Sequence, residues 1–183
     1  MNIFKRLYRH YIKRETTLAY CVRNGFRHGS NFNCFSPDAI DSNWPWLISI
    51  GDNVTISSNV TILAHDASTS MGGKAGTKVG IVKIGSNVFI GANSTVLCNT
   101  RIGDNVIIGA CSLVTKDIPS NSVVAGNPAK ILCSYDEYIA KHQNLQNSRV
   151  ICNQHRWHEW RDAPMSDKMA MAKSLEDGFG YVV

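Results

Sequence analysis

Aliphatic residues recur at every sixth position through the middle of this chain. The recurring positions are Ile50, Ile56, Ile62, Ile84, Ile90, Val96, Ile102, Ile108 and Val114. Small or β-branched residues follow four positions after these lead residues, at Val54, Val60, Val88, Ser94, Thr100, Val106 and Ser112. Six is neither the period of an α-helix nor that of a single strand. The spacing therefore indicates a turn every six residues, with short flat strands between the turns.

Three such hexads close one triangular coil, and successive coils stack their lead residues into an interior column. Parallel strands about 4.8 Å apart then pair along the backbone and satisfy its polar groups. Glycine and asparagine recur where the corners fall, and both residue types tolerate unusual φ angles. A chance run of Ile and Val in a β-sandwich would not give six consecutive positions in register. We expect a mainly β fold, a left-handed parallel β-helix.

The regular spacing is interrupted once, between Ile62 and Ile84. These residues are 22 positions apart, which we interpret as a whole coil plus four residues. A loop near 66–80, rich in glycine and small polar residues, is expected to leave the coil as an exposed flap. Loops that interrupt a strict scaffold are often functional. This loop begins directly after His65, and no other histidine lies inside the repeat.

The two ends of the chain have a different character. Residues 1–31 carry seven Lys and Arg against one Glu, and apolar residues recur at helical spacing within 1–14. We expect residues 1–30 to form a basic, amphipathic helical arm. It either caps the open end of the β-helix, which we favour, or makes weak contact with an anionic membrane surface. The β-helix is expected over 31–134 and a C-terminal helical extension over 135–183, with helices at 135–146 and near 165–176.

Composition excludes several classes of protein. The 183 residues suit one well-cored domain. No apolar run is long enough to span a membrane, and the start resembles no signal peptide. The six cysteines are scattered without CxxC spacing, which favours reduced thiols and disfavours zinc. The net charge of +5 comes from the N-terminal arm, unlike a nucleic-acid-binding protein. We expect a cytoplasmic protein, at most peripheral to the inner membrane face.

The segment HRWHEW near the C-terminus contains His155 and His158 together with Trp157 and Trp160. It could form a metal or stacking site. No carboxylate or cysteine completes a metal-ligand spacing, so we expect a helix that packs its tryptophans, and no metal.

Three stretches of sequence resemble the hexapeptide-repeat acyltransferases, most closely the sugar O-acetyltransferases of polysaccharide clusters. They are ILAHDAST, VKIGSNVFIGANSTVLCNTRIGDNVIIGACSLVTKDIP and VVAGNPAKIL. The similarity covers roughly residues 44–134. It implies a homotrimer with active sites between subunits, acetyl-CoA as the acyl donor, and direct transfer to the acceptor without an acyl-enzyme.

The resemblance also implies roles for individual residues. His65 takes the place of the general base. Donor-binding positions correspond to Phe89, Ala92, Ala110, Thr115, Lys116 and Lys130. The region expected to bind the acceptor matches only loosely, and its candidate residues are Asp38, Asp41 and Trp44. Asp66 adjoins His65, but neighbours in an extended strand face opposite ways, so we do not expect the two to form a pair.

The chemistry is consistent with these roles. A sugar hydroxyl becomes a good nucleophile only when its proton is removed, and histidine is suited to this at neutral pH. We expect acetyl transfer to a sugar hydroxyl of a surface-polysaccharide precursor, on a free, nucleotide-linked or lipid-linked sugar. The alternatives are N-acetylation of an amino sugar, acetylation of serine or a drug, and a non-catalytic scaffold. A metal-dependent hydratase like the γ-type carbonic anhydrases needs three converging histidines, and the repeat offers one.

Overall fold

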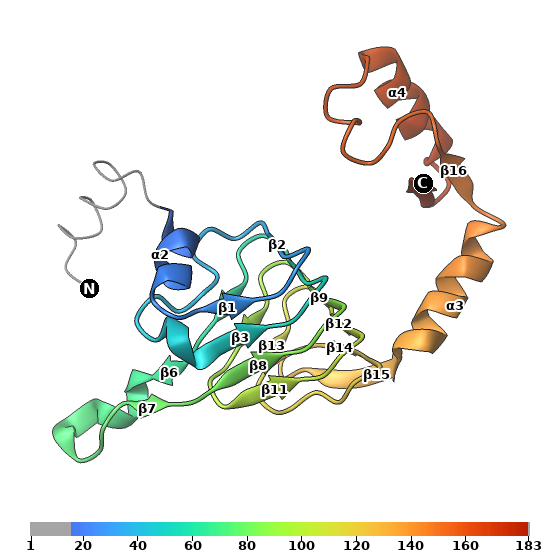
Figure 1. Ribbon diagram of the computed structural model, residues 1–183. Coiled ribbons are helices and arrows are strands. Elements are labelled where there is room, and N and C mark those ends of the chain that lie inside the picture. Colours follow the sequence, from blue (N-terminus) through green and yellow to red (C-terminus); the bar gives the residue numbers. More distant parts are fainter. Residues whose placement is uncertain (1–15, 183) are drawn as a thin grey trace. The chain divides into compact units, whose positions relative to one another are not determined.

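The computed structural model describes residues 16–182, and the amphipathic helix expected within residues 1–14 lies outside this range. The chain divides into two compact units, Met1–Tyr135 and Asp136–Val183. In the first unit, short strands stack as a left-handed parallel β-helix, as the six-residue spacing predicts. Figure 1 shows the strands of successive coils side by side.

Three sheets form the walls of this prism. Wall A consists of β1 (Arg27–His28), β3 (Ile48–Ile50), β8 (Val82–Ile84) and β11 (Thr100–Ile102). Wall B consists of β2 (Asn33–Cys34), β4 (Thr55–Ile56), β9 (Val88–Ile90), β12 (Val106–Ile108), β14 (Ser122–Ala125) and the antiparallel edge strand β15 (Lys130–Ser134). Wall C consists of β5 (Thr61–Ile62), β10 (Thr95–Val96) and β13 (Leu113–Val114).

The lead residues fill the interior of the prism. In wall A, Ile50 pairs with Ile84 and Ile84 with Ile102 across neighbouring coils. All nine lead residues are buried, and so are the seven small or β-branched residues that follow them. Full burial of one such aliphatic side chain contributes about 1.5–3 kcal/mol. The periodic positions therefore supply most of the core cluster.

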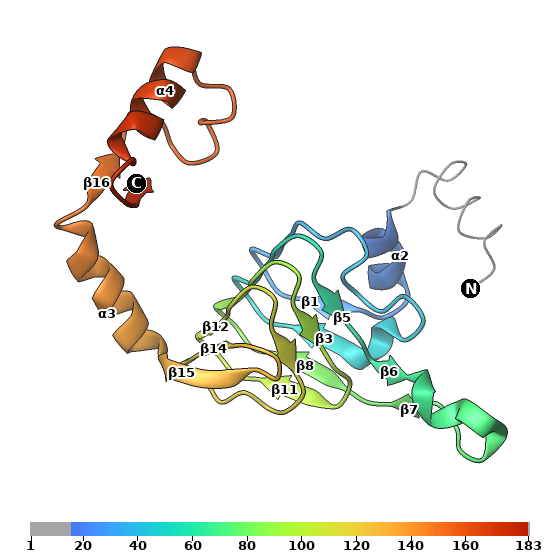
Figure 2. The ribbon, with the colours of Figure 1, turned by 180° about the vertical axis from the view of Figure 1, so that it is seen from behind.

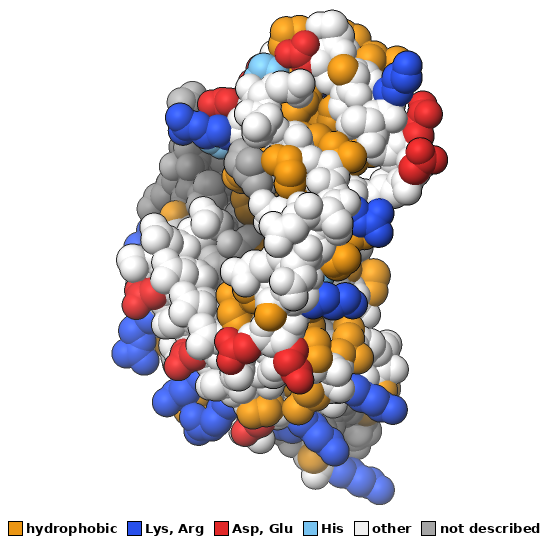
Figure 3. Space-filling model, turned by 90° about the vertical axis from the view of Figure 1, so that its right-hand side faces the viewer, with side chains coloured by type: hydrophobic (Ala, Val, Ile, Leu, Met, Phe, Trp, Pro, Cys, Tyr) orange, Lys and Arg blue, Asp and Glu red, His pale blue; other side chains and the backbone are white. Residues whose placement is uncertain are grey.

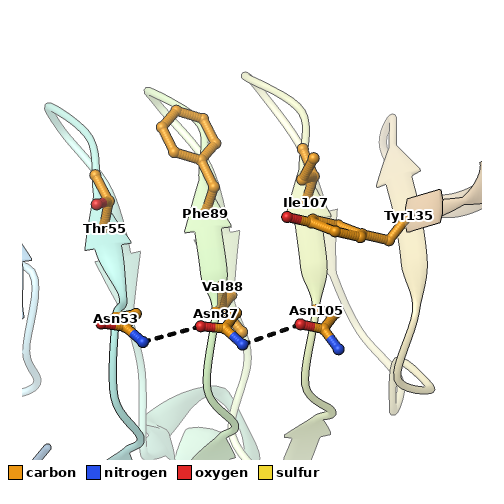
Figure 4. A pocket seen from close by; sticks show the side chains of 8 residues that line it. All are labelled: Asn53, Thr55, Asn87, Val88, Phe89, Asn105, Ile107 and Tyr135. Atoms are coloured by element: carbon orange, nitrogen blue, oxygen red, sulfur yellow. Dashed lines mark hydrogen bonds between the residues drawn. The ribbon is translucent and has the colours of Figure 1, made fainter. Parts of the chain in front are cut away.

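Asparagines hold the corners, and six of those in the repeat have positive φ. Between walls A and B they also form a ladder, in which Asn53 Nδ2 donates to Asn87 Oδ1 and Asn87 Nδ2 donates to Asn105 Oδ1, both at 3.0 Å (Figure 4). A left-handed corner is one of the few conformations in which asparagine is favoured over bulkier residues. Each corner thus turns the chain and ties one coil to the next.

The interruption in the repeat is an insertion at one corner. Ile84 pairs directly with Ile50, so the step from Ile62 to Ile84 is a single hexad with an inserted loop. The expectation of an additional whole coil in this interval is wrong, because the backbone ladder resumes in the very next coil. The loop forms β6 (His65–Asp66), the 3-10 segment η3 (Ala67–Gly73) and β7 (Lys78–Val79). The β6–β7 hairpin projects from the prism in both views (Figures 1 and 2).

A short helix covers the N-terminal end of the prism. Helix α2 (Thr17–Arg23) begins after Thr16, whose side chain accepts a hydrogen bond from the Ala19 amide, and it buries Cys21 in the core. The first coil begins at β1, slightly before the expected boundary at residue 31. A second short segment, η2 (Pro45–Leu47), leads into β3.

The second unit contains α4 (Met165–Ser174) and a parallel pair of strands, β16 (Val150–Cys152) and β17 (Gly180–Val182). Helix α3 (Tyr135–Gln146) begins at the boundary between the units. Both helices expected from the sequence are present.

The expected helix at HRWHEW is wrong, because this segment consists of turns. The Glu159 carboxylate accepts the Arg156 amide at 2.9 Å within the turns, and His155 Nε2 contacts the carboxylate of Asp167 in α4 at 2.8 Å. Trp157 is 71% exposed rather than packed.

Charged and hydrophobic side chains share the surface of the molecule. On the side drawn in Figure 3, Lys and Arg side chains gather along the lower part, with Asp and Glu side chains among them. Hydrophobic side chains reach the surface between them. This side of the molecule therefore exposes both charged and apolar side chains.

Close stacking of coils predicts that alanine at a corner glycine destabilises the fold. A Cβ at Gly85 would lie 2.7 Å from the Gly103 carbonyl carbon and 2.3 Å from Asp104 Oδ1. We expect Gly85→Ala to lower the free energy of unfolding in urea by about 1–3 kcal/mol, as overpacking does. Gly76→Ala is the matched control, since no atom lies within 4 Å of its Cβ position. Equal stability of the two variants would contradict the tight stacking.

Candidate active site

His65 lies at the corner between walls C and A, where the inserted hairpin leaves the prism. It is the first residue of β6 and pairs with Val79 of β7. Its side chain is 25% exposed, so the imidazole is held by the protein and still reaches solvent. The predicted position of this histidine, beside the displaced loop, is confirmed.

Asp41 is the hydrogen-bond partner of His65. Its carboxylate Oδ2 contacts His65 Nδ1, and its side chain is only 3% exposed. A carboxylate only accepts hydrogen bonds when ionised, so Nδ1 of His65 carries the proton. The neutral imidazole then has an unprotonated Nε2. This arrangement suits a general base whose ring orientation is fixed.

The adjoining coil holds Asp41 in place. The Asp41 amide donates to the Ile62 carbonyl at 3.1 Å, which sets the aspartate one coil away from the strand that leads to His65. Its Oδ2 also accepts the Ala64 amide at 3.1 Å, and its Oδ1 accepts the Asn43 amide at 3.0 Å. A buried carboxylate is tolerated only when its oxygens have such partners. The carboxylate is therefore preorganised before any ligand binds.

Asp66 points to a different set of partners. Its carboxylate accepts hydrogen bonds from the Ser68 hydroxyl at 2.6 Å and the Ser68 amide at 3.0 Å, and it lies 3.3 Å from Lys78 Nζ. The Ser68 hydrogen bonds, followed by Lys78, lower the pKa of Asp66. Because its pKa is lowered by folding, these contacts stabilise the hairpin at neutral pH and weaken as the pH falls through the folded-state value.

A shallow depression surrounds His65 on the outer side of wall C. Leu63, Leu97 and Cys98 form its apolar part, and Asp66 and Lys78 form its polar edge, with Ala67 beside them. Leu63 and Leu97 lie in neighbouring coils, each following a strand of wall C. The depression can thus hold an apolar chain next to a polar group near His65.

The donor-binding residues expected from the family resemblance fall on two corners and one wall. Ala92 and Ala110 lie one coil apart at the corner between walls B and C, where the Cys111 amide donates to the Ala92 carbonyl at 2.8 Å. Thr115 and Lys116 are exposed and follow β13, at the same corner as His65. Lys130 is exposed at the start of β15. Wall C therefore separates the corner with Ala92 and Ala110 from the corner with His65.

Phe89 lies on the outer face of wall B, where it is 44% exposed. It lines a second hollow together with Thr55, Ile107, Tyr135 and the asparagine ladder (Figure 4). In Figure 4 the Tyr135 ring lies beside Ile107, while Phe89 projects from β9. Within one copy of the chain, Phe89 and His65 are therefore on different faces of the prism.

The three acceptor-binding candidates differ in exposure, and the Trp44 amide donates to the Asp41 carbonyl at 3.3 Å. Asp38 is exposed, and Trp44 is half-buried against the core with its ring 5.5 Å from that of Trp46. The buried Asp41 carboxylate contacts His65 Nδ1, a contact that the expectation of an acceptor-binding role did not include. Sequence spacing gave no signal for this pair, since 24 residues separate the two positions.

Two further properties concern only the described part of the chain. Among residues 16–182, no group of three or more His, Cys, Asp or Glu side chains is arranged to hold a metal ion. Within the same range, no helix is both long and apolar enough to cross a membrane.

Comparison with known families identifies two profile matches. The family described as "Bacterial transferase hexapeptide (six repeats)" matches residues 81–116, and "Hexapeptide repeat of succinyl-transferase" matches residues 48–64. Both matches fall within the prism, on either side of the inserted hairpin.

Several characterised or named proteins are similar in sequence. Protein CapG of Staphylococcus aureus is 37% identical over 141 residues, which cover 75% of this chain and 82% of CapG. Putative acetyltransferase YvoF of Bacillus subtilis is 40% identical, covering 53% of this chain and 54% of YvoF. Galactoside O-acetyltransferase of Escherichia coli is 35% identical, covering 58% of this chain and 56% of that enzyme. The chain thus spans about half the length of the last two relatives.

Two solved structures resemble the fold. A galactoside acetyltransferase in complex with coenzyme A has a TM-score of 0.52 at 31% identity, covering 63% of this chain and 58% of the other. A maltose O-acetyltransferase from Clostridium difficile 630 has a TM-score of 0.50 at 28% identity, covering 70% and 81%.

The Asp41 contact predicts the tautomer of His65. We expect nitrogen NMR of the intact protein to show neutral His65 protonated at Nδ1. Asp41→Asn should shift the population toward the Nε2-protonated form, because an amide can donate where the carboxylate only accepts. Asp66→Asn is the matched control and should leave the tautomer unchanged, since Asp66 contacts Ser68 and Lys78. An Nε2-protonated wild type would contradict the assignment.

Proposed function

Because this chain belongs to the hexapeptide-repeat acyltransferases, we propose that it transfers an acetyl group from acetyl-CoA to a sugar hydroxyl of a surface-polysaccharide precursor. Membership rests on the match to CapG over most of both chains and on the two family profiles. The galactoside and maltose O-acetyltransferases among the similar proteins favour a sugar as the acceptor. The coenzyme A named in one similar structure favours acetyl-CoA as the donor.

The observation that carries this proposal is the His65–Asp41 pair beside an open depression. A buried carboxylate fixes the Nδ1 proton, and the unprotonated Nε2 is available to an incoming hydroxyl. Acyl transfer to an alcohol needs a base at this point, and a positioned general base contributes about 10²–10⁴-fold. No other histidine of the described chain combines a buried carboxylate with a place in the prism.

In the proposed reaction, His65 Nε2 takes the proton of the acceptor hydroxyl as its oxygen bonds to the thioester carbonyl carbon. Asp41 stabilises the imidazolium that forms. The carbon–sulfur bond then breaks, and His65 returns the proton to the departing sulfur. Proton and charge balance without an acyl-enzyme. Backbone N–H groups at a corner could stabilise the developing oxyanion.

Donor binding is proposed to follow the axis of the prism. Thr115 and Lys116 lie at the His65 corner but two coils further along, about 10 Å away at the spacing of parallel strands. Lys116 and Lys130 are exposed cations that suit the phosphates of coenzyme A. Leu63 and Leu97 suit the less polar part of the donor. The residues present are therefore compatible with a long donor whose acyl end is at His65.

The separation of the two corners favours an active site shared between copies. Ala92 and Cys98 are six residues apart, a span of roughly 20 Å in extended chain. A donor arm that contacts the backbone at Ala92 would have to run along the whole of wall C to reach His65 of the same chain. We propose a homotrimer in which the Ala92–Ala110 corner of one subunit faces the His65 corner of the next, with Phe89 near the entrance.

Acetylation of serine or a similar small acceptor is the second candidate. Serine acetyltransferase 2 of Arabidopsis thaliana is 41% identical over 88 residues, which cover 48% of this chain and 27% of that enzyme. This similarity covers much less of the relative than the match to CapG does. The sugar acceptor is therefore preferred.

Loss of the base should abolish transfer without loss of the fold. We expect His65→Gln to lower kcat for acetyl-CoA and a sugar acceptor about 10²–10⁴-fold, with little change in KM for acetyl-CoA. Size-exclusion chromatography should show the same assembly as the wild type. His158→Gln, at an exposed position in the second unit, serves as the control. Full activity of His65→Gln would rule out the proposed base.

Acceptor profiling separates the two candidates. With acetyl-CoA held constant, we expect free thiol release to depend on added sugars or glycan precursors and to be near background with L-serine. Mass spectrometry of the product should show an ester on the sugar. Efficient acetylation of serine, or an amide on an amino sugar, would favour the alternatives.

A further inference from the structure

A row of polar side chains crosses the outer face of wall A at right angles to its strands. Backbone register places Arg27 opposite Ser49, Ser49 opposite Lys83, and Lys83 opposite Arg101. Arg27, Lys83 and Arg101 are exposed, and Ser49 is half-buried. Three of four successive coils thus present a cation at the same position.

Lys83 and Arg101 are direct neighbours in this row. Parallel strands lie about 4.8 Å apart, and like charges placed directly opposite each other are unfavourable. Within residues 16–182, neither side chain takes part in an ion pair. Asp117, next in the row, uses its Oδ1 to accept the Arg101 amide at 2.8 Å. The two cations therefore lie side by side on neighbouring strands, with the Asp117 carboxylate on the other side of Arg101.

The neighbouring corner shows the opposite arrangement. Serine and aspartate alternate from coil to coil there, and each pair is hydrogen bonded: Ser30 to Asp52, Asp52 to Ser86, Ser86 to Asp104 and Asp104 to Ser120. This alternation keeps like charges two coils apart. The same scaffold thus keeps the aspartates of the corner two coils apart but places the cations of wall A on neighbouring coils. Such a cluster of like charges is typical of a site that binds an ion of opposite charge.

A shallow groove follows the row. It is lined by Ser49, Lys83 and Arg101 on one side and by the corner glycines Gly51, Gly85 and Gly103 on the other. These glycines are required by the stacking of the coils, since a Cβ at any of them would meet the next coil. Asp104 lies at the edge of the groove, where its Oδ1 accepts the Ser86 amide at 2.6 Å. Two cations and one hydroxyl therefore face the groove in three consecutive coils.

We propose that this groove binds the diphosphate of the acceptor, a sugar carried on a nucleoside diphosphate or on a lipid diphosphate. A diphosphate presents oxygens on two linked phosphorus atoms, which match Lys83 and Arg101 one coil apart, with Ser49 as an additional donor. Arginine and lysine in this arrangement form charge-assisted hydrogen bonds with phosphate. The identification of the ligand as the acceptor rests on the proposed sugar acetylation, whereas the diphosphate site itself does not.

The position of the groove fits this role. The Gly80 amide donates to the Ala64 carbonyl at 2.9 Å, and His65 follows Ala64 directly. Lys83 is three residues after Gly80, a distance of roughly 10 Å along an extended strand. Wall A therefore begins at the corner that carries His65.

Direct binding to the intact protein tests the proposal without any turnover. Titration calorimetry would use UDP-glucose and inorganic pyrophosphate, with inorganic phosphate for comparison. We expect Lys83→Gln/Arg101→Gln to weaken pyrophosphate and UDP-glucose binding at least about tenfold, since each lost bond is charge-assisted. Affinity for coenzyme A should be unchanged. Lys141→Gln, an exposed lysine of α3, is the matched control and should bind all ligands like the wild type.

A second arm distinguishes the two sources of the diphosphate. Co-sedimentation with phosphatidylcholine vesicles, with and without polyprenyl diphosphate, should show binding that depends on Lys83 and Arg101 if the carrier is a lipid. Binding of UDP-glucose alone would identify a nucleotide carrier.

Three outcomes would overturn the proposal: wild-type protein that binds neither form, an equal loss of coenzyme A affinity in the double variant, or a changed oligomeric state in it. Retained diphosphate binding in His65→Gln, whatever its transfer activity, would show that the diphosphate site does not depend on the proposed base.

Discussion

The stacking of one aliphatic side chain on another, one coil apart, is the interaction on which the rest of this structure depends. It buries every lead residue and fixes the register of three parallel walls. The backbone ladder then requires that each coil lie directly on the one before it. At most corner glycines the next coil lies so close that an added Cβ would be nearer to it than normal contact distance. Within such a scaffold, an insertion is tolerated only where it can leave and return at a corner.

In this chain the insertion lies at the corner between walls C and A. The inserted hairpin leaves there, His65 is its first residue, and Asp41 is supplied by the adjoining coil. Because the ladder fixes both strands, the carboxylate and the imidazole meet without a ligand to bring them together. The outer faces of the three walls carry different side chains in fixed positions. Wall A has a basic row, wall B has Phe89 and Ile107, and Leu63 and Leu97 follow the strands of wall C.

Much of the fold could be predicted because its period is visible in the sequence. The lead residues, the asparagine corners, the exposed loop after His65 and the helices at 135–146 and 165–174 all follow from local pattern. The Asp41–His65 pair does not follow from local pattern, because it depends on which coil lies against which, and the spacing alone does not show that the insertion contains no coil. The HRWHEW segment forms turns rather than a helix, and the Glu159 carboxylate accepts the Arg156 amide there, an effect of a specific side chain that periodicity does not detect.

In the proposed mechanism, His65, oriented by Asp41, promotes direct transfer of the acetyl group to the acceptor. Cys98 lines the same depression and is the one side chain there that could carry the acetyl group as a thioester. Intact-protein mass spectrometry of acid-quenched single turnovers tests this most directly. Direct transfer predicts that acetylated acceptor appears while the protein mass stays unchanged at every time point. Acetylated protein that forms and decays as fast as the product appears would contradict it.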